Sequence, residues 1–217
     1  MPISPLLSII ACGMRLRMVD KTAILLSGGI DSIALAYWKK PDIAVTIDYG
    51  QVAAEGEIRA AEKVCKELGL VHEVLRIDCR CIGSGEMAGT SSLTISPAEE
   101  WWPFRNQLLV TLAAARLVGR CVTCLMLGTV RTDSEYADGK ESFYAAMDTL
   151  LALQEGALHV LAPAITMTSM ELIKVSGISR EQLSWAHSCT RNNYACGRCR
   201  SCIKHREVMK RLGWPAY

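Results

Sequence analysis

The sequence Ser-Gly-Gly-Ile-Asp-Ser at residues 27–32 constrains this chain of 217 residues more than any other feature. It follows an apolar run at residues 22–26 and precedes a segment with helical apolar periodicity at residues 30–38. A strand, a glycine turn and a helix are therefore expected to meet there. Paired glycines allow backbone conformations closed to other residues, and a helix start presents unpaired N–H groups and a partial positive charge. These features predict a phosphate-binding loop, with an ordinary strand-to-helix turn as the alternative.

The side chains of residues 27–32, here called the phosphate loop, suit a nucleotide. The hydroxyl groups of Ser27 and Ser32 can donate hydrogen bonds to phosphate oxygens, and the Asp31 carboxylate can hold a Mg²⁺ ion that bridges them. The loop lacks the lysine of the Walker motif. The residues expected to bind the nucleotide are Leu25, Leu26, Ser27, Gly28, Gly29, Ile30, Asp31 and Ser32, together with Asp48 and Gln51 after the next strand.

The composition fits one soluble globular domain. Half of the residues are hydrophobic and 21% are charged, and the formal net charge of +2 gives no reason to expect a nucleic-acid partner. No uninterrupted apolar stretch is long enough to span a bilayer, so no membrane partner is expected. A nucleotide site favours the cytoplasm, where the ten cysteines would stay reduced and a cluster of them would more often bind metal.

The expected domain organisation is an N-terminal extension at residues 1–20 and one domain at residues 21–217. The extension is either a loose segment or the result of an upstream start codon, with Met18 as the true start. An export signal is less expected because the apolar core is short and no basic segment precedes it.

Strand and helix patterns alternate along the chain. Strands are expected at residues 22–27, 43–48, 73–77, 122–127 and 159–161, and helices at 30–39, 53–68, 106–118, 142–155, from 169 onward and near 203–212. Repeated units of this kind predict an α/β fold with a doubly wound parallel sheet. Ligands bind such sheets at the carboxyl ends of the strands. Ser27, Asp48 and the loop after Leu127 should converge there, under a lid formed by residues 79–103.

Four cysteines near the end of the chain have the spacing of a metal site. Cys189, Cys196, Cys199 and Cys202 follow the pattern C-x6-C-x2-C-x2-C in a polar segment, which predicts a structural zinc site within residues 187–206. Free buried cysteines and an iron–sulfur cluster are the alternatives, and His187 or His205 could replace one sulfur. Cys121 and Cys124 flank a strand and point to opposite faces, so they are interpreted as core cysteines.

The phosphate loop is similar to that of the ATP pyrophosphatases, and its pairing with this cysteine cluster resembles the 7-cyano-7-deazaguanine synthase (QueC) family over residues 21–212. Weaker matches fall in the family's order at residues 48–51, 101–106, 132–138 and 162–165. The resemblance implies that ATP activates the carboxylate of 7-carboxy-7-deazaguanine with release of pyrophosphate, that ammonia gives an amide, and that a second activation gives the nitrile used in queuosine biosynthesis. It also implies a homodimer.

The resemblance implies roles for a further set of residues. Arg105 could hold a phosphate or the substrate carboxylate and is assigned a catalytic role with Ser27, Asp31 and Ser32. Carboxylates can accept hydrogen bonds from the N–H groups of a deazaguanine edge, and an aromatic ring can stack on it. The expected substrate-binding residues are Arg105, Asn106, Asp133, Glu135, Tyr136 and Asp138, each with a solvated loop residue as the alternative interpretation.

Departures from the family pattern keep other functions open. Residues 52–55 lack the usual basic run, Phe104 replaces a glycine, and Ser169 stands where a lysine is usual. Glu135, Ala137 and Gly139 replace a glycine, a proline and a cysteine. The pattern suggests a diverged paralogue.

One alternative function, by resemblance, is that of an enzyme of bacterial anti-phage defence that links a deazaguanine to a protein amine. Others are a tRNA-thiolating relative that uses Cys79 or Cys81, and a non-catalytic nucleotide-binding partner protein.

Overall fold

The computed structural model describes residues 20–214 of the chain. The expected N-terminal extension, and with it the choice of Met18 as the start, falls on residues 1–19 and lies outside the described residues. Within the part of the chain that is described, no helix has both the length and the apolar character needed to cross a membrane.

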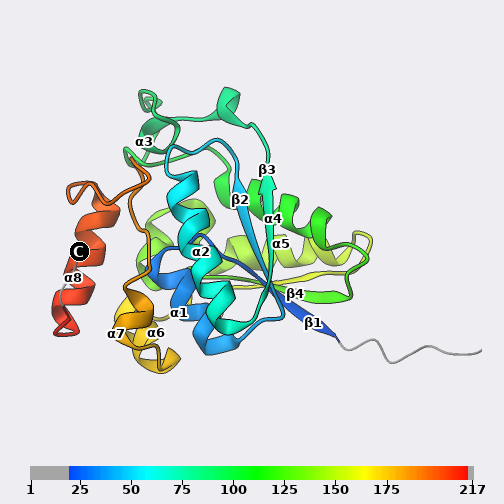
Figure 1. Cartoon of the computed structure of the whole chain (residues 1–217). Coiled ribbons are helices and arrows are strands. Elements are labelled where there is room, and N and C mark those ends of the chain that lie inside the picture. The colour runs from blue at the N-terminus through cyan, green and yellow to red at the C-terminus, as the bar shows by residue number, and fades with distance from the viewer. Residues whose placement is uncertain (1–19, 215–217) are drawn as a thin grey trace, which may run out of the picture.

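A parallel sheet forms the centre of the described fold (Figure 1). Its strands are β1 (Lys21–Leu25), β2 (Ile43–Asp48), β3 (Val71–Arg76), β4 (Val122–Leu127) and β5 (His159–Leu161). They lie in the order β3-β2-β1-β4-β5, and every neighbouring pair is parallel. Leu25 at the end of β1 pairs with Val45 on one side and with Leu127 on the other. The order confirms the predicted doubly wound α/β sheet.

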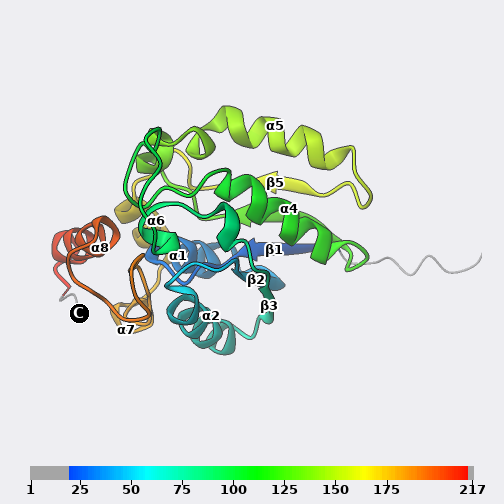
Figure 2. The same cartoon turned by 90° about the horizontal axis from the view of Figure 1, so that it is seen from above.

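Helices cover both faces of the sheet (Figure 2). One face carries α4 (Arg105–Leu117) and α5 (Glu141–Ala152). The other carries α1 (Ile30–Lys39), α2 (Ala54–Leu68), α6 (Ser169–Ser176), α7 (Arg180–Leu183) and, at its outer side, α8 (Arg200–Arg211). The connections contain the short helix α3 (Gly85–Ala88) and the 3₁₀ turns η1 (Arg80–Ile82), η2 (Arg131–Glu135) and η3 (Ala137–Gly139).

Side chains that alternate along β1 join the two helix layers to the sheet. Ala23 packs into the core under α4 and α5, whereas Ile24 and Leu26 pack into the core under α1, α6 and α8. Successive residues of a strand point to opposite faces, so the buried part of a central strand is apolar on both faces, as at Ala23 and Ile24. Burial of one such Ile or Leu side chain stabilises the fold by about 1.5–3 kcal/mol.

Two helix starts differ from the sequence-based prediction. The helix α7 was not predicted, although Ser179 and Gln182 form a capping box in which the Ser179 hydroxyl accepts a hydrogen bond from the Gln182 N–H at 3.3 Å. The helix α8 begins at Arg200 and not near Ile203, because the Cys199 sulfur acts as its N-cap and accepts from the Cys202 N–H at 3.4 Å.

The strand order places a crevice beside β1. The chain continues to β2 and β3 on one side of β1, whereas β4 and β5 lie on the other. Connections that leave in opposite directions open a crevice at the carboxyl ends of the central strands. Residues 79–103, here called the lid segment, contain η1 and α3 and are anchored at this edge by Trp102. Its buried ring meets that of Tyr49, which follows β2, edge to face at 4.8 Å.

Candidate active site

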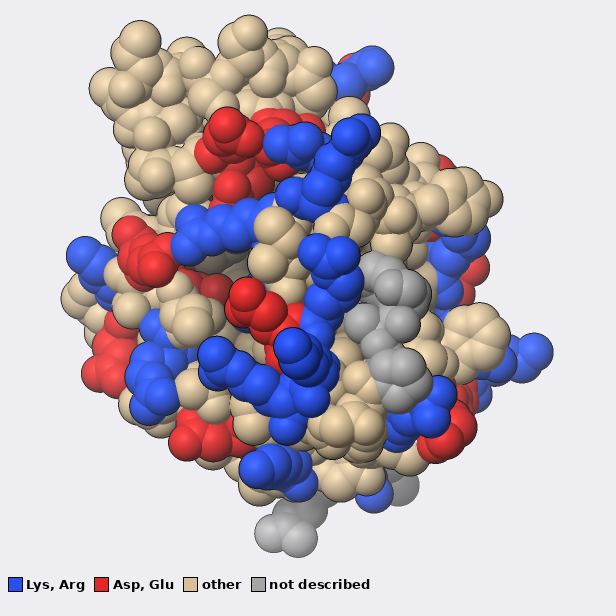
Figure 3. All heavy atoms as spheres, turned by 90° about the vertical axis from the view of Figure 1, so that its left-hand side faces the viewer, with Lys and Arg blue, Asp and Glu red and all other residues tan. Residues whose placement is uncertain are grey.

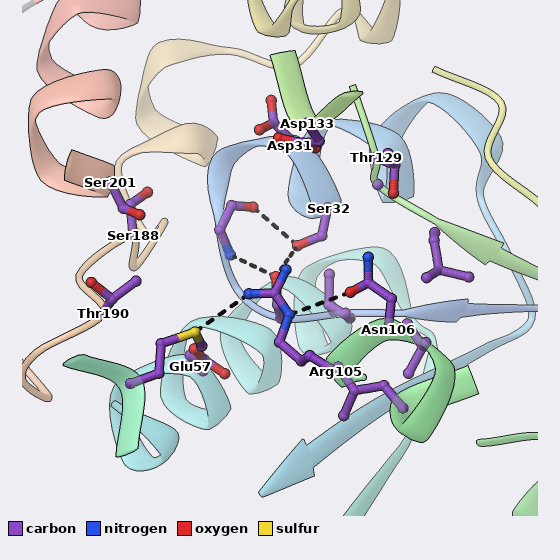
Figure 4. Close-up of a pocket in the computed structure, with 18 of the residues that line it drawn as sticks. Asp31, Ser32, Glu57, Arg105, Asn106, Thr129, Asp133, Ser188, Thr190 and Ser201 are labelled. Carbon is purple, nitrogen blue, oxygen red and sulfur yellow. Dashed lines mark hydrogen bonds between the residues drawn. The ribbon is translucent and has the colours of Figure 1, made fainter. Parts of the chain in front are cut away.

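A cavity of about 300 Å³ opens at the carboxyl ends of β1, β2 and β4. Its lining comes from parts of the chain that are far apart in sequence: the phosphate loop, the start of α4, residues 127–139 and residues 187–204. Figure 4 shows Asp31 and Asp133 toward one end of this cavity and Arg105 and Glu57 toward the other. The predicted convergence on the phosphate loop therefore includes the loop after Leu127.

The phosphate loop is held tightly between α1 and α2. Gly28 has a φ of +75°, and a Cβ atom there would lie 2.6 Å from the Glu57 carbonyl oxygen. The Ser27 and Ser32 hydroxyl oxygens lie 3.1 Å apart, and the Ser32 hydroxyl donates to the Gly29 carbonyl at 3.0 Å. The glycine pair thus lets the backbone approach α2 and leaves the start of α1 facing the cavity.

A third glycine packs directly against the phosphate loop. Gly128 follows β4 directly, and a Cβ atom there would lie 2.8 Å from the Cα atom of Ser32. Any larger residue would push β4's loop away from the start of α1. The loop after Leu127 was predicted to lie at the site, but this glycine was not, because nothing local to Gly128 in the sequence indicates a contact with α1.

One end of the cavity carries a lysine between two carboxylates. The Lys204 Nζ atom lies 3.0 Å from Asp31 Oδ2 and 3.8 Å from Asp133 Oδ1. Asp133 also accepts a hydrogen bond from the Val130 N–H at 3.0 Å. Burial raises the pKa of Asp133 even though Lys204 and this hydrogen bond oppose the shift. The buried Asp31 Oδ1 atom has no hydrogen-bond partner among the described residues. It is an oxygen of the kind that Mg²⁺ prefers.

The other end of the cavity contains an arginine without a carboxylate partner. Arg105 makes no ion pair with any described residue; its guanidinium contacts the Met87 sulfur and the Asn106 side-chain oxygen, each at 3.3 Å. Burial acts to lower the pKa of Arg105, but the nearby carboxyl groups of Asp138 and Asp133 are among the groups that raise it overall. Arg105 is therefore a charged group that can accept an anionic ligand.

Asn106 and Asp138 hold each other in the cavity wall. The Asn106 backbone N–H donates to Asp138 Oδ2 at 3.2 Å, and the Asn106 side-chain amide donates to the Asp138 carbonyl at 3.0 Å. These bonds tie the start of α4 to η3. One carboxylate oxygen of Asp138 is thus already an acceptor for the Asn106 backbone N–H, and the other oxygen has no such bond to Asn106.

Glu57 is a half-buried carboxylate on the cavity lining that was not predicted from the sequence. Burial raises its pKa to about 7, against smaller opposing effects of Gln51 and Arg105. The Gln51 side-chain amide donates to Glu57 Oε2 at 2.9 Å and to the Ile47 carbonyl at 3.0 Å. A Glu on an amphipathic helix has no local mark of function, so only the fold reveals its place.

Some expected binding residues do not line the cavity. Gln51 is buried behind Glu57, and its side-chain oxygen accepts from the Tyr49 N–H at 2.9 Å. Asp48 forms an ion pair with Arg76 at 2.9 Å in a separate shallow hollow. Glu135 points toward solvent and pairs with Arg200.

Tyr136 does line the cavity. Its hydroxyl donates to Glu100 of the lid segment at 2.7 Å and accepts from Arg200 at 3.1 Å. Burial is the largest of the effects that raise the pKa of Tyr136, so the phenol stays neutral and can donate this bond. The residue thus connects the lid segment with α8 over the cavity.

Two of the departures from the family pattern have visible structural consequences. Phe104 adopts a left-handed conformation with a φ of +53°, which suits the glycine that is usual there, and its ring is 75% exposed. Ser169 is buried at the start of α6 and is absent from the cavity lining, so α6 contributes no side chain to the site where a lysine is usual.

The four predicted metal ligands come together in one cluster. The sulfur atoms of Cys189, Cys196, Cys199 and Cys202 all lie within 4.8 Å of one another. A tetrahedral zinc site with bonds of about 2.3 Å requires sulfurs roughly 3.8 Å apart, and the Cys196 and Cys202 sulfurs are 3.9 Å apart. The cluster could therefore bind zinc.

The surroundings of this thiolate cluster support a metal. Burial acts to raise the pKa of Cys196, but the backbone N–H groups of Arg198 and Cys199 lower it to about 6. The cluster of possible ligand atoms contains the four sulfurs and neither histidine. His205 Nδ1 contacts the Ser188 hydroxyl at 2.9 Å, and His187 Nε2 contacts the Asn192 carbonyl at 3.0 Å. Cys121 and Cys124 are half-buried and lie outside the cluster.

The thiolate cluster also adjoins the cavity. Cys189 lies on the cavity lining, and the neighbouring His187 N–H donates to the Gly28 carbonyl at 2.8 Å. The His187 ring fits against Gly56, where a Cβ atom would lie 2.6 Å from His187 Nε2. The segment that carries the thiolate cluster, here called the metal-binding segment because its four sulfurs could bind zinc, is thus part of the site's wall and not a separate appendage.

A parallel α/β sheet with a phosphate loop beside its central strand defines a protein with the ATP pyrophosphatase type of fold. The chain belongs to the QueC family: the family model described as "Queuosine biosynthesis protein QueC" matches residues 21–213. This match confirms the resemblance found in the sequence. It places the chain among the proteins of queuosine-type biosynthesis.

Curated relatives match over nearly the whole chain. The 7-cyano-7-deazaguanine synthase of Chromobacterium violaceum is 30% identical over 218 residues, covering 90% of this chain and 92% of its own length. The synthase 1 of Desulfitobacterium hafniense is 28% identical over 204 residues, covering 88% and 92%. The synthase of Methanosarcina barkeri is 27% identical over 219 residues, covering 89% and 95%.

Proposed function

We propose that this protein uses ATP to adenylate the carboxylate of a 7-carboxy-7-deazaguanine-type substrate and then forms a C–N bond at the activated carbon. The observation that carries the proposal is the division of the cavity. The carboxylates of Asp31 and Asp133 lie toward one end, and Arg105, which forms no ion pair with a described residue, lies with the half-buried Glu57 toward the other. The phosphate loop adjoins both ends, since it contains Asp31 and its Gly28 packs against the backbone of Glu57. The names of the curated relatives support a deazaguanine as the substrate class.

The ATP end of the cavity is formed by the phosphate loop. The Ser27 and Ser32 hydroxyls and the N–H groups at the start of α1 would hold phosphate oxygens. The oxygens of Asp31, with Asp133 beside it, would hold Mg²⁺. A bound Mg²⁺ supplies charge neutralisation on the phosphates.

The substrate end is assigned to residues of α4 and of the turns that follow β4. Arg105 orients the substrate carboxylate, since a guanidinium can donate two parallel hydrogen bonds to it. Asp138 accepts from an N–H group of the deazaguanine edge, and Tyr136 contacts its ring. Asp133 is assigned to the ATP end and not to the deazaguanine, because it lies beside Asp31 and Lys204. Glu135 is assigned no contact because it pairs with Arg200 outside the cavity.

The first chemical step makes a good leaving group from a poor one. A carboxylate oxygen attacks the α-phosphorus of ATP, and the bond to the bridging oxygen breaks with its electron pair leaving on pyrophosphate. A nitrogen lone pair then attacks the acyl carbon, and the C–O bond breaks as AMP leaves. Glu57 is suited to take the proton that the nitrogen loses, because a base with a pKa of about 7 is half-ionised near neutral pH.

An assay of the purified, zinc-loaded protein tests the proposal. Incubation with ATP, Mg²⁺, ammonium and 7-carboxy-7-deazaguanine should release AMP and pyrophosphate in equal amounts. The parent 7-deazaguanine, which lacks the carboxylate, should release neither. Asp31→Asn should reduce the release by about 10²-fold or more, as expected for loss of phosphate-site electrostatics. ATP bound by active protein but never converted to AMP would contradict the proposal.

The mass of the product decides what attacks the activated carbon. With ammonium as the nitrogen source, an amide or a nitrile should appear, and the nitrile requires a second equivalent of ATP. Covalent addition of the deazaguanine to a protein amine would instead indicate the conjugating reaction. The replaced residues in segments 52–55 and 135–139 make this experiment necessary.

The positions of the cysteines favour acyl activation over tRNA thiolation. Among the described cysteines, Cys189 is the only one on the cavity lining, and it belongs to the thiolate cluster. Cys79 is buried and Cys81 is exposed, and both lie outside the cavity. The variants Cys79→Ser and Cys81→Ser should therefore turn over at the wild-type rate.

A further inference from the structure

Lys204, like Glu57 and Gly128, belongs to the site although the sequence did not indicate it. It lies on α8, among basic residues that the sequence presents as an ordinary solvated helix face. Figure 3 shows lysine and arginine side chains gathered on the face of the molecule that carries this helix. Unlike Lys210 and Arg211, which are exposed, Lys204 turns inward and lines the cavity.

The contacts of Lys204 place a positive charge beside the phosphate loop. Its Nζ atom is 3.0 Å from Asp31 Oδ2, in the loop itself, and 3.8 Å from Asp133 Oδ1. Arg105 and Lys204 are the only arginine and lysine among the described residues that line the cavity. Arg105 lies toward the opposite end, beside Glu57 and Asn106 (Figure 4). Lys204 is thus the cation of the phosphate end.

The charges at this end are not balanced. One ammonium group faces two carboxylates, and the phosphate loop contains no basic residue of its own. A lysine has three N–H donors on a flexible four-carbon stem, so its ammonium group can change acceptor while the helix stays in place. If the carboxylate oxygens of Asp31 are taken by Mg²⁺, the ammonium group is released toward the phosphates.

We propose that Lys204 is a catalytic residue that leaves Asp31 when ATP binds and donates to the phosphate oxygens that depart as pyrophosphate. This inference rests on the proposed adenylation. The ammonium group keeps its proton throughout, and its charge offsets the negative charge that grows on pyrophosphate as the bond to the α-phosphorus breaks. The lysine that a Walker loop carries within its own sequence is here supplied by α8.

The thiolate cluster fixes the position of Lys204. Cys199 caps α8, Cys202 lies in its first turn, and Lys204 follows two residues later. Metal binding by these sulfurs would hold the start of the helix against the cavity, which gives the metal an indirect role in placing the cation.

Direct binding measurements separate this inference from the adenylation reaction. Lys204→Met should weaken the binding of ATP and of inorganic pyrophosphate by about tenfold, measured by calorimetry without any carboxylate substrate. It should slow AMP formation by about 10²-fold while leaving the KM for the deazaguanine carboxylate unchanged. The matched control is Lys210→Met on the exposed side of α8, which should behave as wild type. Zinc content and melting temperature verify that each variant is folded.

Two further variants distinguish direct contact between the Lys204 ammonium group and phosphate from a purely structural role of this residue. Added ethylammonium should restore part of the activity of Lys204→Ala, because it can supply the missing ammonium group. The double variant Lys204→Met, Asp133→Asn removes one uncompensated carboxylate, and it should stay as weak in ATP binding as Lys204→Met. Wild-type affinity for ATP in Lys204→Met, or in the double variant, would overturn the proposal, even if the wild-type protein adenylates no carboxylate.

Discussion

At the scale of single residues, the site depends on groups held in positions that cost stability. Gly28 bends the phosphate loop against α2, and Glu57 keeps a carboxylate in a place that favours its neutral form. Both features lie where the proposed ligands would bind. Their costs can be measured by substitution.

Gly28→Ala should destabilise the protein and abolish ATP binding. A side chain at positive φ costs about 1–2 kcal/mol, and the new Cβ atom would also lie 2.6 Å from the Glu57 carbonyl. Gly69→Ala is the matched control, because Gly69 has a φ of +70° with nothing within 4 Å of the added atom. Urea denaturation should show a lower free energy of unfolding for both variants, with the larger decrease for Gly28→Ala. Equal decreases in the free energy of unfolding, together with unchanged ATP affinity of Gly28→Ala, would contradict the tight packing of Gly28 against Glu57.

Glu57→Gln should alter the pH dependence of stability. Between pH 4.5 and about 7, folded Glu57 keeps a proton that the unfolded chain has released. The free energy of unfolding therefore falls as pH rises through this window, by at most about 1.4 kcal/mol per unit from this group. Urea denaturation at several pH values should show that Glu57→Gln loses this slope, while Glu62→Gln, on the exposed side of α2, retains it.

The same variant tests the assigned proton acceptor. The rate of C–N bond formation in the wild type should rise with pH through about 7, as Glu57 ionises. In Glu57→Gln this rise should be absent and the rate low, while pyrophosphate release in the first half-reaction continues. A pH–rate profile identical to that of the wild type would remove Glu57 from this role.

At the scale of elements, the metal-binding segment and the lid segment are joined across the cavity. Arg191 pairs with Glu86 and with Glu99 of the lid segment, and Arg200 pairs with Glu100 and contacts Tyr136. These arginines are 39% and 53% exposed, so each pair contributes at most about 1 kcal/mol and is screened by salt. Their effect should concern closure of the lid more than global stability.

Arg191→Gln should loosen the lid segment without lowering the melting temperature measurably. Chymotrypsin should cut within residues 93–104 several-fold faster than in the wild type, and raising the salt concentration should narrow the difference because it weakens the wild-type ion pairs. Arg198→Gln serves as control, since this exposed arginine forms no ion pair with any described residue. Equal cleavage rates in all three proteins would show that the ion pairs do not hold the lid.

At the scale of the whole molecule, the sheet order and the thiolate cluster assemble one cavity from distant segments. The order β3-β2-β1-β4-β5 places the phosphate loop beside the turns that follow β4. The cluster then closes the remaining side by holding Cys189 and α8 against the loop. Metal loss should therefore damage ATP binding as well as stability.

Cys202→Ser should lose the metal, lower the melting temperature and weaken ATP binding at least tenfold. Cys202 is fully buried, so its replacement removes one sulfur from the cluster and loosens the start of α8. Metal analysis, thermal unfolding and ATP titration check the three effects, with the exposed Cys81→Ser as control. Metal-free protein that binds ATP as tightly as the wild type would contradict the structural link.

The sequence by itself determined what is encoded locally. The strand and helix pattern, the phosphate loop and the four metal ligands were predicted because short-range periodicity, paired glycines and C-x2-C spacing each act within a few residues. Arg105, Asp133 and Asp138 were found through resemblance, and the cavity includes them. Asp48, Gln51 and Glu135 were expected to bind ligands, but the fold turns them to other partners.

Only the tertiary structure decided which charges meet at the phosphate end. Lys204 and Asp31 are separated by 173 positions in the chain, and neither carries a local mark of the other. Gly128 and Glu57 likewise became part of the site only when β4 and α2 packed beside α1. A contact of this kind depends on the relative placement of whole elements, which hydrophobic burial fixes without specifying any pair in the sequence.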